Sequence, residues 1–201
     1  QPDLASQGGL NQALGLMNHY SVPVDQETLA ALYELRSGVI SAATFKDFPH
    51  FAQCSAICLE LADGRWIALQ AQGEDLEFKF EVFALQARIA ERPGHMEHHS
   101  IELAAPVTVT PLLTESWLDP SLPTGPTIGS DPIVQCVGVS GSAPATASAT
   151  CRYLGGVELK AADGSALVVA TGGFPYTLHV TGLSEDSGFS RSDYSALPAE
   201  A

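Results

Sequence analysis

Basic residues are scarce in this chain: 9 lysines and arginines stand against 23 aspartates and glutamates, a net charge of −14. The imbalance is evenly spread, with 13 acidic and 6 basic residues in 1–100 and 10 and 3 in 101–201. A field of this sign repels nucleic-acid phosphates and anionic membranes and attracts basic proteins. We therefore expect no nucleic-acid or membrane partner. The alternative is that the charge serves only solubility.

Long apolar runs are also missing. No stretch approaches the roughly 18 residues that a membrane-spanning helix needs, and the first residues, QPDLASQGG, have neither the basic nor the apolar region of a signal peptide. These absences predict a soluble protein, from which a leader could have been removed before residue 1. Localisation stays open between the cytoplasm and, if the cysteine pair discussed below is oxidised, the periplasm or the exterior.

Catalytic and cofactor signatures are absent as well. The chain has no H-E-x-x-H, P-loop, Rossmann or EF-hand motif. GVSGS at 138–142 departs from the nucleophile elbow G-x-S-x-G, because its last two residues are exchanged. His95, His98 and His99 follow a Pro-Gly pair, and we interpret them as solvated loop histidines, with metal binding as the alternative. The sequence therefore predicts no cofactor, no metal and no catalytic residue, which argues against an enzyme.

The first 45 or so residues have helical periodicity. GGLNQALGLMNHY (8–20) places Leu10, Leu14 and Met17 on one helical face. A second helix is expected in DQETLAALYELRSG (25–38), with Asp25 as its N-cap and Gly38 as its C-cap. The two patterns predict an N-terminal helical segment.

A period of two begins near residue 50, and a pattern occurs twice. ICLELADGRWIAL (57–69) and VELKAADGSALVV (157–169) share four of thirteen residues, including an Asp-Gly pair. Asp-Gly favours a two-residue type I′ hairpin turn, with positive φ at both residues. In that register Leu61 faces Trp66 and Leu59 faces Ala68, so that the apolar residues of both copies fall on one side of their hairpins.

Each copy is followed by an aromatic strand pattern, LEFKFEV (76–82) and FPYTLHV (174–180). We therefore predict a β-rich α+β fold, in which the helical segment precedes two similar antiparallel β-meander units packed as a sandwich or barrel-like sheet pair. The segment 101–117 is expected to be extended, and the Pro-rich stretch 118–132 is typical of a loop. A soft boundary there divides 1–117 from 118–201 within one compact domain.

Carboxylates line the first aromatic strand pattern. Glu74, Asp75, Glu77 and Glu81 form either a solvated sheet face or a contact surface for a basic protein. We expect a non-enzymatic protein-binding module of the immunity or inhibitor kind, which would neutralise a basic toxin or nuclease. The alternative is an enzyme or small-ligand carrier, with a pocket between the β units lined by Trp66, Phe78 and Tyr176.

The four cysteines lack the paired spacing of a zinc site. Cys136 and Cys151 are equidistant from Ala143-Pro144, so two strands paired about that point would place them directly opposite each other, within disulfide range. We expect this disulfide, and Cys54 and Cys58 as separate thiols with Cys58 on the face opposite Leu59. The alternative is four reduced, buried cysteines.

Overall fold

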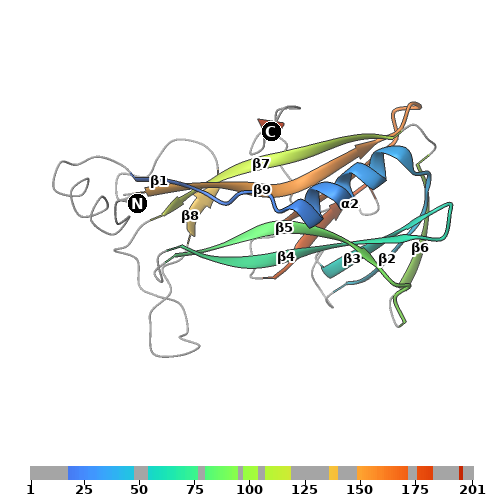
Figure 1. The fold of residues 1–201 in the computed structure, drawn as a ribbon, viewed down its shortest axis with the longest axis horizontal. Helices are drawn as coiled ribbons and strands as arrows, with labels where there is room; N and C mark the ends of the chain where they lie inside the picture. The colour runs from blue at the N-terminus through green and yellow to red at the C-terminus, as the bar shows by residue number, and fades with distance from the viewer. Residues whose placement is uncertain are drawn as a thin grey trace.

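The chain folds into a β-rich structure with one short helix, seen in a computed structural model (Figure 1). It describes residues 18–47, 54–76, 80–94, 97–103, 107–118, 136–139, 149–171, 176–182 and 195–196. The elements are β1 (Asn18–Ser21), α2 (Gln26–Ser37), β2 (Ile40–Asp47), β3 (Cys54–Leu61), β4 (Trp66–Leu76), β5 (Phe80–Ala90), β6 (Glu97–Leu103), β7 (Thr108–Leu118), β8 (Cys136–Val139), β9 (Ala149–Lys160), β10 (Ala166–Thr171), β11 (Leu178–Thr181) and β12 (Ser195–Ala196).

The strands form one sheet that curls into a half-barrel. Hydrogen-bonded neighbours follow the order β12-β7-β9-β10-β11-β3-β2-β6, and β4, β5, β1 and β8 branch from this path. The expected division into two meander units, packed as a sandwich or barrel-like sheet pair, is not confirmed, because β11 joins β3 at Leu178 and Cys54 and makes the sheet continuous. In the described residues, no helix is both long and apolar enough to cross a bilayer.

Helix α2 lies across the opening of the curled sheet, between the β7–β9 and β4–β5 arms (Figure 1). It starts where the Asp25 side chain accepts the Thr28 N–H at 2.7 Å, and Gly38 caps its other end. Its buried side chains, Thr28, Ala31, Leu32 and Leu35, recur at helical spacing, and the three apolar ones join the main core. This burial explains why an amphipathic sequence of twelve residues is helical here.

Residues 18–20, expected to end a helix, instead belong to β1, which pairs with β9 in parallel. The rest of the expected first helix lies outside the described residues. Pro23, which separates β1 from α2, fits this change of direction because proline cannot continue a strand ladder or a helix interior.

The first Asp-Gly pair lies in a hairpin turn, but its loop has three residues and not two. The Leu61 N–H donates to the Arg65 carbonyl, and the Gly64 N–H donates to the Leu61 carbonyl, both at 2.9 Å. Gly64 has φ +86°, whereas the described non-glycine residues have positive φ only at Tyr176. Asp63 therefore lacks the left-handed conformation of a type I′ turn. Its carboxylate accepts the Arg65 N–H at 3.1 Å, which supports a type I turn followed by a glycine bulge.

The second turn has the same geometry. The Ala161 N–H donates to the Ser165 carbonyl at 2.9 Å, and the Gly164 N–H donates to the Ala161 carbonyl at 3.0 Å. Gly164 has φ +92°, and the Asp163 carboxylate accepts the Ser165 N–H at 2.9 Å. The type I′ prediction is wrong at both turns for the same reason.

The additional loop residue moves the register by one position in both hairpins. Leu59 faces Ile67, where a two-residue loop would have placed Ala68, and Leu159 likewise faces Leu167. Trp66 and Ala68 lie on the other side of the sheet, so their predicted place on the core face is wrong. The residues that share the main core are Ile57, Leu59, Leu61, Ile67 and Leu69 from the first hairpin, and Val157, Leu159, Ala161, Leu167 and Val169 from the second.

The pattern at 76–82 is not one strand. β4 ends at Leu76 and β5 starts at Phe80, and these two residues face each other across an antiparallel ladder. The chain therefore reverses between them, and alternation of aromatic residues alone could not show this. The expected extended segment 101–117 corresponds to the end of β6 and to most of β7.

A second, smaller core cluster forms where β1 bridges the two arms of the sheet. Its buried members come from β5 and β9, and Tyr20 and Val22 pack against them. The buried residues of this cluster are Val82, Ala84, Ala149, Cys151 and Tyr153. The cluster lies beside the segment that connects β1 to α2, where a small pocket remains.

Candidate functional site

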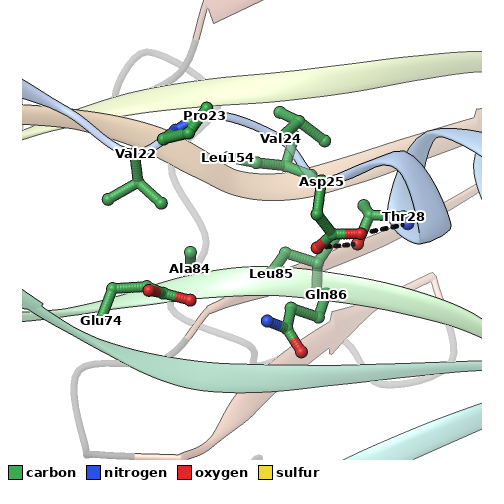
Figure 2. Close-up of a pocket in the computed structure, with 10 residues that line it drawn as sticks. All are labelled: Val22, Pro23, Val24, Asp25, Thr28, Glu74, Ala84, Leu85, Gln86 and Leu154. Atoms are coloured by element: carbon green, nitrogen blue, oxygen red, sulfur yellow. Dashed lines mark hydrogen bonds between the residues drawn. The ribbon is translucent and has the colours of Figure 1, made fainter.

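A small pocket lies under the segment that connects β1 to α2, where β5 and β9 approach each other. Figure 2 shows Val22, Pro23 and Val24 on one side and the β4–β5 residues on the other. The pocket encloses about 20 Å³, which is room for one water-sized group. It is lined by Val22, Pro23, Val24, Asp25, Thr28, Glu74, Ala84, Leu85, Gln86 and Leu154.

The connecting segment is held over the pocket by the start of α2. Asp25 accepts both the N–H and the hydroxyl of Thr28, at 2.7 and 3.0 Å (Figure 2). The Thr28 hydroxyl oxygen in turn accepts the Ala87 backbone N–H at 3.2 Å. This last bond satisfies a donor on the side of β5 that β4 does not pair, so the helix cap also fixes the helix to the sheet.

Two half-buried polar side chains, Glu74 and Gln86, line the pocket without a hydrogen bond or ion pair among the described residues. The hydrogen bonds drawn between the lining residues join only Asp25 and Thr28 (Figure 2). Glu74 and Gln86 lie on the same face of the β4–β5 ladder as Ala84, because the register pairs Glu74 with Val82 and Gln70 with Gln86. Two polar groups with free bonding capacity therefore border an otherwise mostly apolar space.

The four carboxylates predicted as a contact surface lie around the end of the β4–β5 hairpin. Glu74 is the one whose side chain lines the pocket. Asp75 and Glu81 occupy facing positions in the ladder, while Glu77 lies outside the described residues. The structure thus brings three of these positions to one end of a hairpin, and their role in binding stays a prediction.

The alternative site, an aromatic pocket between the β units, has no counterpart in the described residues. Trp66 is buried beside Cys58 and Ala68 and faces Ala90 in the ladder. The ring of Tyr176 instead lies 5.0 Å from that of Phe83, between ring centroids, in an edge-to-face contact. Seven strand residues separate positions 83 and 90, about 23 Å at the usual rise. Trp66 and Tyr176 therefore cannot line one small pocket, and Phe78 lies outside the described residues.

The cysteine prediction rested on pairing the strands of Cys136 and Cys151, and this pairing is wrong. β7 lies between β8 and β9, with Leu118 facing Cys136 and Ser116 facing Cys151. Two strand spacings, about 9–10 Å, then separate the cysteine backbones, whereas a disulfide needs Cα atoms within about 7 Å. The prediction of a symmetric hairpin is wrong because β7 (108–118) lies between the two strands that were expected to pair.

Cys58 does lie on the face opposite Leu59, as the alternation of the strand predicts. Burial raises the pKa of the Cys58 thiol above its usual value, and the nearby Arg88 charge opposes this change. The thiol is therefore protonated at neutral pH and behaves as a small apolar group.

His98 and His99 are not in a loop as expected, because β6 includes them and pairs them with Thr44 and Ala43 of β2. His95 lies outside the described residues. Within the described part of the chain, no three His, Cys, Asp or Glu side chains gather in a way that could hold a metal ion.

Arg65 forms the ion pairs that the structure gives for the described residues. It contacts Glu34 of α2 and Asp63 of its own turn, each at 2.7 Å. Hydrogen bonds from Arg65 hold the pKa of the Asp63 carboxyl below its usual value. In the second turn, hydrogen bonds from the Ser165 side chain and backbone lower the pKa of Asp163.

The sequence singled out Glu74 as an acidic residue and Asp25 as a helix cap, but it did not indicate the other residues that line the pocket. Gln86, Val22 and Leu154 come from β5, the β1–α2 connection and β9, which are far apart in the chain. No local motif marks them, because their proximity depends on how the sheet curls. The Asp25 N-cap was the one local signal for this region.

Comparison with known proteins gives no relative from which a function could be transferred. No protein-family model, curated protein or solved structure matches this chain.

Proposed function

We propose that this chain is a non-enzymatic module that binds a basic protein, in the manner of an immunity or inhibitor protein that neutralises a basic toxin or nuclease. The observation that carries the proposal is its surplus acidic charge, −14 over 201 residues. Ion pairs within the chain do not reduce this net charge, because it already counts every lysine and arginine. An unneutralised field of one sign accelerates association with a partner of the opposite sign.

The end of the β4–β5 hairpin is the proposed contact region. Its ladder brings Asp75 opposite Glu81 and Glu74 opposite Val82, the next residue along the paired strand. Asp75 and Glu81 therefore share one face of the hairpin, which would offer two acidic positions to lysine or arginine side chains, and Glu74 lies on the other face. The alternative small-ligand function would need a cavity of roughly 300 Å³ or more, and the pocket found in the described residues is far smaller.

The finer architecture is also proposed. We infer that the two Asp-Gly hairpins derive from one duplicated β unit, within a chain that has a helical N-terminal segment. The support is that both turns have the same hydrogen bonds and that core positions recur at an offset of one hundred, as Leu59 and Leu159 do.

Charge reversal tests the proposed function. The variant Glu77→Lys/Glu81→Lys should slow association with a basic protein partner, purified from the native host, by about tenfold at low salt. The matched control Glu115→Lys/Glu158→Lys changes the net charge equally on β7 and β9 and should slow it by about threefold or less. Stopped-flow rates at several ionic strengths give both values, and circular dichroism checks folding.

Equal slowing by both variants would show that net charge matters but that the hairpin end is not the interface. A rate that does not change with ionic strength, or the absence of any basic protein partner, would overturn the proposed function.

A further inference from the structure

We propose that the pocket under the β1–α2 connection binds a primary ammonium group, with the Glu74 carboxylate as its charge partner. The inference rests on the proposed function, and the ammonium group is assigned to a lysine side chain of the basic partner. Binding of a lysine side chain in this pocket would add one specific contact to the long-range electrostatic attraction between the two proteins.

The electrostatic argument starts from Glu74. Its carboxylate is half-buried beside Val22 and Ala84, and no described group pairs with it. A carboxylate that is partly removed from water and has no partner gains most from a cation that enters its site. The net charge of −14 adds a favourable long-range field for such a cation.

The size of the pocket favours an ammonium group over a guanidinium group. About 20 Å³ holds one water-sized group, as a tetrahedral ammonium head is, whereas a planar guanidinium with its three nitrogens is too large. An ammonium group has three N–H donors. Two carboxylates belong to residues that line the pocket, those of Glu74 and Asp25, and each Asp25 oxygen keeps a lone pair beyond the one that Thr28 uses.

The apolar walls complete the fit to lysine. Val22 and Val24 are half-buried lining residues, so the methylene groups that carry the ammonium head would lie outside the pocket, against their exposed parts. The hairpin end that contributes Glu74 carries further acidic residues at positions 75 and 81. Positions 75 and 81 lie on the face of the hairpin opposite Glu74, so they add to the long-range field at the site and not to the contacts of the ammonium head.

The test is NMR titration of the full chain with n-butylammonium chloride at constant ionic strength, with n-butylguanidinium chloride as the size control. We expect saturable shifts at the backbone amides of Val24, Ala84 and Leu85, and at least about fivefold weaker binding of the guanidinium. In Glu74→Gln the ammonium Kd should rise about fivefold or more. Glu60→Gln, which changes a half-buried carboxylate on β3, should leave the Kd within about twofold.

A second pair of probes identifies the source of the ammonium group. The blocked tripeptide Ac-Gly-Lys-Gly-NH2 should produce the same shifts, and Ac-Gly-Arg-Gly-NH2 should not. If n-butylammonium binds but the lysine peptide does not, the pocket is a site for free amines and the lysine assignment is overturned. Absence of saturable shifts at these amides, or equal binding to Glu74→Gln and the parent, overturns the ammonium site itself.

These outcomes are separable from the proposed function. Ammonium binding that persists while no basic protein partner exists would leave the site standing and remove the function. A basic partner that binds Glu74→Gln as tightly as the parent would leave the function standing and remove the anchor.

Discussion

The two Asp-Gly hairpins have the same backbone but different attachments to the rest of the molecule. In each, a three-residue loop ends in a glycine of positive φ, and the aspartate accepts the N–H two residues on. At Arg65, however, the first turn is tied to α2 through Glu34, whereas the equivalent Ser165 donates its hydroxyl to Asp163 within its own turn. Local sequence thus sets the turn, and one side chain decides whether it carries a tertiary contact.

The hairpins also differ at one equivalent position of their first strands, β3 and β9. Gly156 takes the place that Ala56 has in the first copy, and a Cβ there would meet the Val169 carbonyl oxygen at 2.8 Å and Ala170 at 3.1 Å. β9 is hydrogen-bonded to β7 and β10 along much of its length, and the β7 register shifts beside this glycine. β3 is also paired on both sides, with β2 and β4. The second copy is therefore the more tightly constrained one because of the close approach at Gly156 and not because of its place in the sheet.

The largest loss of stability is expected from a substitution at position 156, which tests the difference in constraint between the two copies. Gly156→Ala should lower the free energy of unfolding by about 2 kcal/mol or more, because the new methyl group overlaps backbone atoms that cannot move aside. The mirror change, Ala56→Gly, should cost about 1 kcal/mol or less, the usual cost of glycine in a strand. Urea unfolding of both variants measures the contrast, and equal losses would contradict the difference in constraint.

Valine at either turn glycine tests what the hairpins share. Gly64→Val and Gly164→Val should each destabilise by about 1 kcal/mol or more, because a β-branched residue is strained at positive φ. A Cβ at either position would meet no atom of the surrounding fold within 4 Å, so steric overlap adds nothing and the two losses should be similar. If both variants unfold at the parent's urea concentration, the turn geometry, and with it the proposed duplication, is wrong.

The smallest expected effect is a difference between Asp63 and Asp163 in how salt changes their carboxyl pKa. Both carboxyl pKa values lie below the usual value, Asp63 through hydrogen bonds from Arg65 and Asp163 through those from Ser165. A carboxyl whose folded pKa is lowered contributes stability above its unfolded pKa of about 3.9, and this is lost as the pH falls through the folded pKa. Because 1 M salt screens an exposed charge pair, it should raise the pKa of Asp63 and leave that of Asp163 nearly unchanged.

Carbon-13 NMR titration of the two carboxyls at low and high salt measures this contrast. Equal responses of Asp63 and Asp163 to salt would show that the Arg65 charge does not distinguish the turns. Arg65→Ser, which gives both turns the same Ala-Asp-Gly-Ser sequence, should abolish the difference.

The sequence indicated the elements better than their arrangement. The cap residues of α2, the two Asp-Gly turns and the alternation that separates Cys58 from Leu59 all followed from local rules. The register did not, because a two-residue and a three-residue loop suit the same Asp-Gly pair and differ only in which strands they align. The pairing of Cys136 with Cys151 failed for a related reason, since a strand distant in sequence occupies the place between them.

Of the pocket, the sequence provided Glu74 as a carboxylate near a hairpin end and Asp25 as a helix cap. It could not indicate that Val22, Gln86 and Leu154 meet beside them, because these residues come from three segments that only the curl of the sheet brings together.

The sequence by itself therefore determined the β-rich composition of the fold, the start and end of its helix, the positions of its two tight turns and its strongly acidic charge. These depend on backbone preferences, on side chains within a few residues and on composition. Only the tertiary structure decided the strand order, the register and the pocket. All three depend on burying the apolar faces of distant strands, such as those of Leu59 and Leu159, in one common core. Many strand orders would bury the face of a single hairpin, but few bury the faces of all the strands together.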